Sequence, residues 1–347
     1  MRDLLPSDRP GLLLAPMQDI TDLAFMRVMA ARGGPDVFVT EYFRVHPDSR
    51  LEPDILRSVT ENPTGRPIFA QMIGRDIPAL VRTAKALERH AVAGIDLNLG
   101  CPAPIVCRKD AGGALLRQPE HLNAILGALR DAVLGRFTVK TRVGYDHADE
   151  FGSLVEIFRR HGIDALSIHA RTVSERYQTP VHPEWVKHAV SVLPCPVIAN
   201  GNVVDVATGL AYQQQTGAAG LMIGRGAIRN PWIFSQLKDA FAGRSPRPVT
   251  RADLLGYILH LSDQVASETR RFDSHGHVNR MKKYLVFIAQ GLDPDFEFQI
   301  RRVTTPEQFA ATCSEFLSDD RPAPTSPPVH SKLFCGFGAL LDPSAGL

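Results

Sequence analysis

Long apolar runs are missing from this chain of 347 residues, and so are closely spaced cysteine pairs. No apolar stretch approaches the roughly 18 residues that a transmembrane helix needs, so we expect no membrane partner. Residues 1–17 mix acids and prolines with apolar residues, which is not the layout of a signal peptide, and a cytoplasmic location is expected. The five cysteines are scattered without a CxxC pair, which argues against a metal site and against a disulfide framework.

A strong net charge is also absent. The formal net charge is +2 and the isoelectric point is about 8.3, so composition alone does not indicate a polyanionic partner. Apolar residues make up 44% of the chain and charged residues 22%, which is ordinary for a globular protein. The length allows one large domain and a smaller one.

Short β-rich runs alternate with amphipathic helical stretches from residue 12 to about residue 240, and 77–90 and 119–133 are clear helical patterns. Eight strand–helix units of roughly 30 residues are typical of a (β/α)8 TIM barrel, an α/β fold. The alternative is a doubly wound open sheet, but the first strand leads into APMQDITD rather than a GxGxxG loop. We therefore predict a barrel. Its expected strands are 12–16, 37–42, 68–74, 94–100, 137–144, 165–171, 196–201 and 220–226.

The sequence changes character after residue 243. GRSPRPVTR (243–251) is rich in proline and arginine, and no strand-like run follows it. The expected helices beyond it are 252–271, 277–291 and 305–317. We expect a barrel domain at 1–242, an all-helical C-terminal domain at 243–320 and a flexible tail at 321–347.

Polar residues stand near the ends of five expected strands, mostly spaced by two. In a barrel, alternate strand residues face the interior and active sites lie at the C-terminal strand ends. Burying one such group without a partner costs roughly 1–3 kcal/mol, so polarity at the same end of five strands favours a ligand site. The residues are Gln71, Asp96, Asn98, Lys140, Arg142, His169, Arg171, Asn200 and Asn202.

Two glycine-containing loops indicate the nature of the ligand. NGN (200–202) and GRG (224–226) follow the seventh and eighth strands, the usual phosphate-binding position of this fold. Glycine lets backbone N–H groups approach phosphate oxygens, and Arg225 adds charge. Lys140, expected near the barrel axis, is a fixed cation suited to a ring that becomes anionic on reduction. Together these features favour FMN.

The ordered set of motifs resembles the tRNA-dihydrouridine synthases of the bacterial type. APMQDITD, the strand with Gln71, DLNLGCP, GGALL, VKTRVG, IHART, ANGN and IGRGAIRNPW follow the family's order over about residues 10–300. The resemblance implies an FMN-containing barrel whose C-terminal helical domain helps to dock tRNA. It also implies reduction of the C5–C6 double bond of a D-loop uridine, with NADPH or NADH as the reductant.

The resemblance also implies roles for single residues. Cys101, in the matching GCP, would be the general acid that gives a proton to C5, while flavin N5 gives a hydride to C6. The alternative is that Cys101 is only a small buried hydrophobic residue, and for Cys107 we prefer this structural interpretation. The implied cofactor contacts are Pro16, Met17 and Gln18 along the flavin, Gln71 and Lys140 at its polar edge, His169 beside it, and Asn200, Gly201, Asn202, Gly224 and Arg225 at the ribityl phosphate.

A basic run indicates a nucleic-acid surface in the helical part. Residues 270–283 contain five basic residues, among them Arg270 and Arg271, and one acid, Asp273. A solvated helix face would explain such a run, but a target uridine in folded RNA must be pulled from its stack, which calls for a basic surface near the barrel mouth. The candidate substrate or tRNA contacts are Asn98, Arg108, Lys109, Arg142, Arg171, Arg280, Lys282 and Lys283.

Two other functions compete with tRNA reduction. One is another FMN-dependent barrel oxidoreductase acting on a free pyrimidine, similar to dihydroorotate dehydrogenase, which would not need the helical domain. The other is an RNA-binding protein that has lost catalysis, which would not need Gln71, Lys140 and Cys101 together. We expect a monomer that binds tRNA and no metal.

Overall fold

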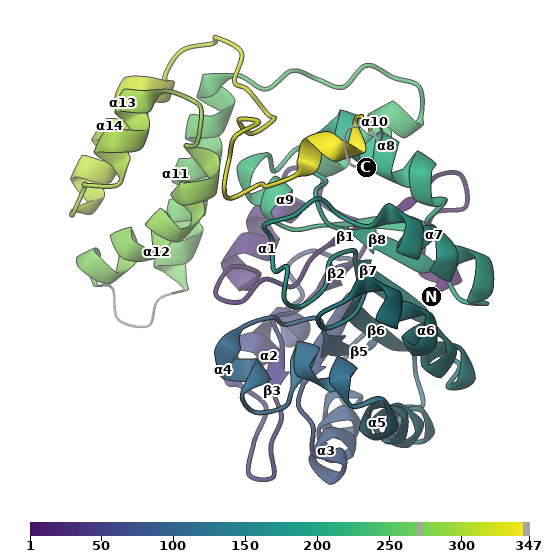
Figure 1. Ribbon diagram of the computed structural model, residues 1–347. Helices are drawn as coiled ribbons and strands as arrows, with labels where there is room; N and C mark the ends of the chain where they lie inside the picture. Colours follow the sequence, from purple (N-terminus) through teal and green to yellow (C-terminus); the bar gives the residue numbers. More distant parts are fainter. Residues whose placement is uncertain (269–272, 343–347) are drawn as a thin grey trace.

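The computed structural model describes residues 1–268 and 273–342, and its centre is a parallel barrel (Figure 1). The strands are β1 (Gly11–Leu14), β2 (Phe38–Val39), β3 (Phe43–Arg44), β4 (Ile68–Ile73), β5 (Gly94–Leu99), β6 (Phe137–Arg142), β7 (Ala165–His169), β8 (Val197–Asn200) and β9 (Gly220–Ile223). They follow the order β1-β9-β8-β7-β6-β5-β4-β2, and a parallel bridge between Leu13 and Val37 closes the ring. The predicted (β/α)8 barrel is confirmed.

The second of the eight barrel positions is divided. Both β2 and β3 pair with β4, where the sequence predicted one strand at 37–42. Thr40 lies between them, and its hydroxyl accepts the backbone N–H of Gln71 at 3.1 Å. A side-chain oxygen thus replaces a main-chain carbonyl in the ladder, which interrupts the strand without leaving the Gln71 donor unsatisfied.

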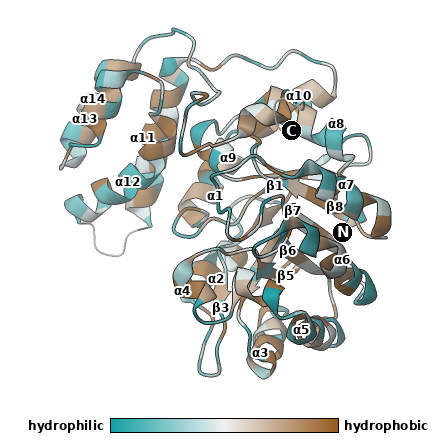
Figure 2. Ribbon diagram, in the orientation of Figure 1, coloured by the Kyte–Doolittle hydropathy of each residue, from teal (hydrophilic) through white to brown (hydrophobic). Residues whose placement is uncertain are grey.

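Helices follow the strands and surround the barrel. They are α1 (Leu23–Ala30), α2 (Pro53–Thr60), α3 (Ile77–Leu87), α4 (Pro104–Cys107), α5 (Pro119–Ala132), α6 (Phe151–Arg160), α7 (Pro183–Val192), α8 (Val206–Thr216), α9 (Arg225–Arg229) and α10 (Ile233–Phe241), with the 3-10 turns η1 (Arg2–Leu4), η2 (Gly112–Arg117) and η3 (Ala148–Glu150). Asp22 and Asp76 begin α1 and α3 by accepting backbone N–H groups with their carboxylates. Hydrophobic residues predominate in the central strands, while the surrounding helices also carry hydrophilic residues (Figure 2).

Four helices follow the barrel: α11 (Arg251–Ser267), α12 (Ser274–Ile288), α13 (Pro294–Ile300) and α14 (Pro306–Leu317). Thr250 and Thr305 cap α11 and α14. The predicted C-terminal helical part is therefore confirmed, and α13 is an addition that Asp293 as N-cap followed by Pro294 signals in the sequence. No helix in the described part of the chain is both long and apolar enough to span a membrane.

The helical part packs against α1 and α9 of the barrel (Figure 1). Phe25 of α1 stacks on Tyr284 of α12 with ring centroids 5.7 Å apart. Residues 321–342 then return to the barrel and include the turn η4 (Phe337–Leu340), whose Phe337 and Leu340 are buried. The domain boundaries at 242 and 320 and the expected flexibility of 321–347 stay predictions.

Candidate active site

A cavity of about 430 Å³ opens at the C-terminal ends of the barrel strands. Its size is within the range of small-molecule and cofactor sites. Loops that follow most of the strands contribute to its wall, so residues far apart in the sequence meet there. The predicted site residues that line it are Pro16, Met17, Gln18, Asn98, Cys101, Lys140, Arg142, His169, Asn200, Gly201, Asn202, Gly224 and Arg225.

The loop that carries Cys101 is held by a side chain of the strand before it. Asn98 Oδ1 accepts the backbone N–H of Cys101 at 2.6 Å and that of Gly100 at 3.0 Å. The carbonyl of Cys101 in turn accepts the N–H of Gly113 at 3.1 Å. These bonds fix the turn at the end of β5, and the half-buried Cys101 side chain lies at the cavity wall.

The inward polar residues of β4 and β5 satisfy one another. Gln71 Nε2 donates to Asp96 Oδ2 at 2.7 Å, and Asn98 Nδ2 donates to Gln71 Oε1 at 2.8 Å. Thr138 Oγ1 donates to the other oxygen of Asp96 at 2.6 Å. Burial raises the pKa of Asp96, against the effect of these hydrogen bonds. The chain of bonds explains how strand β5 tolerates Asp96 and Asn98 inside the barrel.

Gln71, which the resemblance predicts at the polar edge of the flavin, is a residue of β4. Its side chain is fully buried and is not part of the cavity wall. The Gln71 amide donates to Asp96 and accepts from Asn98, so Gln71 holds the Asn98 side chain in place. Direct contact between Gln71 and a cofactor stays a prediction.

Two cations from β6 reach the cavity. Burial and the neighbouring Arg142 lower the pKa of Lys140 from 10.5 to about 8. Arg142 is 1% exposed, and its guanidinium donates to the carbonyls of Gly100, Thr172 and Arg176 at 2.7–2.8 Å. Neither Lys140 nor Arg142 has a carboxylate within ion-pair distance in residues 1–268 and 273–342. Their positive charge is therefore available to an anion in the cavity.

His169 is neutral in this arrangement. The guanidinium Nη1 of Arg171 lies 3.3 Å from His169 Nε2, so this ring nitrogen acts as the acceptor. Burial, together with Arg142 and Arg171, holds the pKa of His169 well below 6.5. Arg171 itself is fully buried behind His169 and does not line the cavity; burial and the nearby Arg225 lower its pKa to about 10.

The loops after β8 and β9 form one end of the cavity wall. Gly201 has φ +122°, and a Cβ there would lie 2.8 Å from Val181 and 3.0 Å from the His169 ring. A Cβ on Gly226 would lie 2.3 Å from the carbonyl oxygen of Val203. Asn202, at φ +58°, has a buried Nδ2 without a hydrogen-bond partner in the described residues. An unpartnered amide donor beside bare backbone fits the oxygens of a phosphate or of a ribityl chain.

Two tyrosines at the cavity were not predicted. Tyr177 lies between two cations, with its ring centroid 5.1 Å from the guanidinium carbon of Arg142 and 4.4 Å from that of Arg225. Tyr42 donates its hydroxyl to Gln18 Oε1 and lines the wall together with Cys101. Tyr177 stands in the irregular segment after β7, where periodicity gives no signal. Tyr42 is the last residue of the expected strand 37–42, and this position was the available hint.

The predicted basic contacts fall into two groups. Arg108 and Lys109 are exposed on the loop after Cys101, and neither has an ion pair among the described residues. Lys282 is half-buried on α12. Arg280 and Lys283 instead pair with barrel carboxylates, Asp22 and Asp19 respectively. Arg270 and Arg271 lie outside the described residues.

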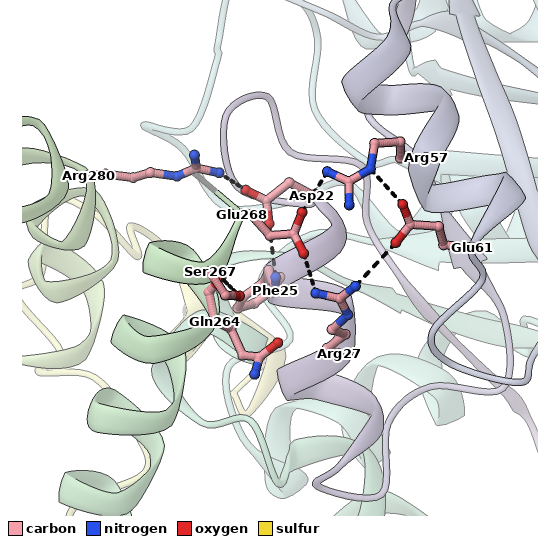
Figure 3. A network of polar contacts seen from close by, with 9 residues as sticks. All are labelled: Asp22, Phe25, Arg27, Arg57, Glu61, Gln264, Ser267, Glu268 and Arg280. Atoms are coloured by element: carbon pink, nitrogen blue, oxygen red, sulfur yellow. Dashed lines mark hydrogen bonds and ion pairs between the residues drawn. The ribbon is translucent and has the colours of Figure 1, made fainter. Parts of the chain in front are cut away.

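Arg280 is part of a network of ion pairs that joins the helical part to the barrel (Figure 3). Glu268 at the end of α11 accepts from Arg27 of α1 and from Arg57 of α2, and Arg57 also pairs with Glu61. Asp22 is an N-cap and an ion-pair partner at once, since it accepts from the N–H of Phe25 and from Arg280. At least one basic residue of this region, Arg280, therefore helps to pack the helical part against the barrel.

The sequence profile of the dihydrouridine synthase (Dus) family matches residues 13–320. The chain belongs to the dihydrouridine synthase family. As a dihydrouridine synthase it is an enzyme, a flavin-dependent reductase on a TIM barrel. The match ends before the segment that returns to the barrel at 321–342.

Curated relatives are similar over most of their length. A tRNA-dihydrouridine(16) synthase of Cupriavidus necator is 33% identical over 79% of this chain and 87% of its own. One of the same name from Pseudomonas putida is 33% identical over 80% and 88%. A probable tRNA-dihydrouridine synthase of Rhodobacter capsulatus is 35% identical over 89% and 95%. Among solved structures, a morphinone reductase mutant in complex with tetrahydroNAD has 12% identity and a TM-score of 0.49 over 69% of this chain and 88% of that one.

Proposed function

We propose that this dihydrouridine synthase reduces the C5–C6 double bond of a D-loop uridine in tRNA, with FMN as cofactor and NADPH or NADH as reductant. One observation carries the proposal: Cys101 meets Lys140, Arg142 and His169 around a single cavity at the strand ends. A thiol beside a cationic, partly apolar cavity provides both a proton donor and a place for an anionic cofactor.

The residues present fit FMN. Pro16, Met17 and Gln18 would pack along the ring system, and Lys140 would lie at its polar edge. Asn200, Gly201, Asn202, Gly224 and Arg225 would hold the ribityl phosphate, since backbone N–H groups and the free Nδ2 of Asn202 are donors there. When bound, FMN supplies the hydride that uracil C6 receives.

The protein supplies the proton. As C6 of the uracil gains a hydride, negative charge develops on the ring, and the Cys101 thiol donates its proton to C5. The thiolate that remains then regains a proton from solvent. Asn98 orients this thiol by holding the backbone N–H of Cys101, and a placed acid contributes typically about 10²–10⁴-fold to the rate.

Binding of tRNA requires that the target base leave its stack and enter the cavity. Arg108 and Lys109 stand exposed on the loop that follows Cys101, where they would meet phosphates next to the flipped uridine. Arg280 and Lys283 contribute first by fixing α12 on the barrel, because Asp22 and Asp19 neutralise them.

The test uses purified protein and a tRNA transcript that contains no dihydrouridine. We expect a yellow protein with the absorption spectrum of FMN, which forms dihydrouridine in the D-loop when NADPH is added. A protein that holds FMN and oxidises NADPH but reduces a free pyrimidine instead of tRNA would overturn the substrate assignment.

A further inference from the structure

The last described part of the chain crosses the mouth of the barrel. We call residues 326–341 the C-terminal strap; they lie beyond the region that the family profile matches, residues 13–320. In Figure 1 the strap runs from the helical part back to α8, and its short helix η4 lies beside α8 and α10. Phe334 of the strap lines the same cavity as Cys101 and Arg225.

Arg229 of α9 anchors the chain just before and at the start of the strap. Its guanidinium is 2% exposed and donates to the carbonyls of Pro324, Thr325 and Ser326. The same guanidinium donates to carbonyls at the end of α12, among them that of Gln290 at 2.6 Å. Arg229 therefore connects the start of the strap to both the barrel and the helical part.

The far end of the strap is fixed as well. Gly336, at φ +73°, passes so close to Pro180 that a Cβ on the glycine would lie 2.7 Å from the proline nitrogen. Phe337 and Leu340 are buried, and Gln215 of α8 donates to the carbonyl of Leu340 at 2.6 Å. Residues 331–336 are thus held between two anchored ends across the mouth.

Two arginines of the cavity region use the strap as their acceptor. Arg225 donates to the carbonyl of Leu333, and Arg171 donates to the carbonyl of Cys335 at 2.9 Å. No carboxylate within residues 1–268 and 273–342 forms an ion pair with either guanidinium, so backbone carbonyls orient these charges without neutralising them. A neutral acceptor on one side leaves the full positive charge for an anion on the other.

The Phe334 side chain supplies an apolar wall. It is 2% exposed, and its ring lies 5.9 Å from that of Phe287 of α12 in an edge-on arrangement and 5.9 Å from the guanidinium carbon of Arg225. It packs with Val204, two residues after the NGN loop. Phe334 therefore stands at the end of the cavity where the loops after β8 and β9 meet.

We propose that the C-terminal strap is part of the cofactor site and retains FMN by its phosphate end. Phe334 closes this end against water, while the carbonyl of Leu333 orients Arg225, a residue of the cavity wall, towards the phosphate. The inference rests on the proposed FMN site. Its consequence is specific: loss of Phe334 weakens binding of FMN more than binding of riboflavin, which has no phosphate.

The experiment compares wild type with Phe334→Ala and Phe334→Leu, with Val329→Ala as a control, since Val329 is on the same strap and 73% exposed. We expect FMN to dissociate from Phe334→Ala about tenfold faster or more, from Phe334→Leu at an intermediate rate, and from Val329→Ala at the wild-type rate. The ratio of FMN to riboflavin affinity should fall in Phe334→Ala. Equal dissociation from Phe334→Ala and wild type, or an unchanged ratio, would overturn the proposal.

Hydrogen exchange of the wild-type protein gives a test that needs no variant to fold. Adding FMN to the apoprotein should slow amide exchange in residues 331–337 as well as in residues 200–203. Protection of 200–203 alone would remove the strap from the site while leaving the FMN site intact. A wild-type protein that binds no FMN at all would instead contradict the proposed function.

Discussion

Asn98 holds the backbone of Cys101: its Oδ1 accepts the N–H of Cys101 at 2.6 Å, while its Nδ2 donates to Gln71. The reactive loop is thus attached to the barrel interior through one amide side chain. Two roles are possible for such a residue at a cavity wall, holding the substrate or holding the thiol in place. The hydrogen bonds favour the second role, and direct contact of Asn98 with the substrate stays a prediction.

Replacing Asn98 by alanine tests this role. We expect kcat to fall about 10- to 100-fold, because an unheld loop misplaces the thiol, while KM for tRNA changes little and FMN remains bound. Steady-state kinetics on a tRNA transcript measure both constants. Asn123→Ala, a change on the outer helix α5, serves as the control and should behave as wild type. A raised KM at unchanged kcat would instead make Asn98 a substrate contact.

Lys140 should make cofactor binding depend on pH. Its pKa of about 8 in the folded apoprotein lies below 10.5, so between these values the unfolded chain holds the proton more tightly, and Lys140 makes the apoprotein more stable as pH rises through that window. An anionic cofactor favours the charged lysine, so FMN affinity should fall as pH rises above about 8.

Fluorescence titration of the apoprotein with FMN at about pH 7 and about pH 9.5 measures this dependence. In Lys140→Met the affinity should be lower at the first pH and change much less between the two. A variant with the same pH dependence as wild type would show that another group is responsible.

Arg108 and Lys109 should contact RNA phosphates. The double change to alanine should weaken tRNA binding and lower the slope of log affinity against log salt by about 1–2, because fewer counterions are released. The melting temperature should not move, since both side chains are exposed and have no ion pair among the described residues. Arg280→Gln should instead lower the melting temperature, because it breaks the ion pair with Asp22. An unchanged salt slope in the double variant would exclude the loop from the RNA interface.

Arg229 should be essential for stability. Its buried guanidinium donates to carbonyls of two segments, 287–290 and 324–326, so Arg229→Met leaves several buried acceptors unpaired and should cost at least about 3 kcal/mol in the free energy of unfolding. Denaturant unfolding measures the loss. Arg302→Met, an exposed arginine after α13, should change stability by about 0.5 kcal/mol or less. Similar effects of the two changes would contradict the anchoring role.

The barrel was predictable because its strands are continuous apolar runs whose period and spacing are local properties of the sequence. The strand at 94–100 is found at Gly94–Leu99, and that at 68–74 at Ile68–Ile73. The strand at 37–42 was wrong in detail, since the hydroxyl of Thr40 replaces a carbonyl only when β4 is beside it. Such a side-chain substitution depends on a partner strand and leaves no periodic signal.

The site was predictable where its residues stand on strand ends, as Lys140 and His169 do. Tyr177 and Phe334 were missed because they reach the cavity from irregular segments, and their place depends on packing against residues distant in sequence. The pair between Arg280 and Asp22 was missed for the same reason, since the two residues are 258 positions apart in the sequence, and contact of Arg280 with tRNA stays a prediction.

The most direct test of the central claim maps dihydrouridine in the tRNA of a strain that lacks the gene, complemented with wild type, Cys101→Ala or Cys107→Ala. We expect wild type and Cys107→Ala to restore dihydrouridine at a D-loop position, and Cys101→Ala to restore almost none although the purified variant keeps its FMN. Full restoration by Cys101→Ala would contradict the assignment of the proton donor, and no dihydrouridine with wild type would contradict the proposed function itself.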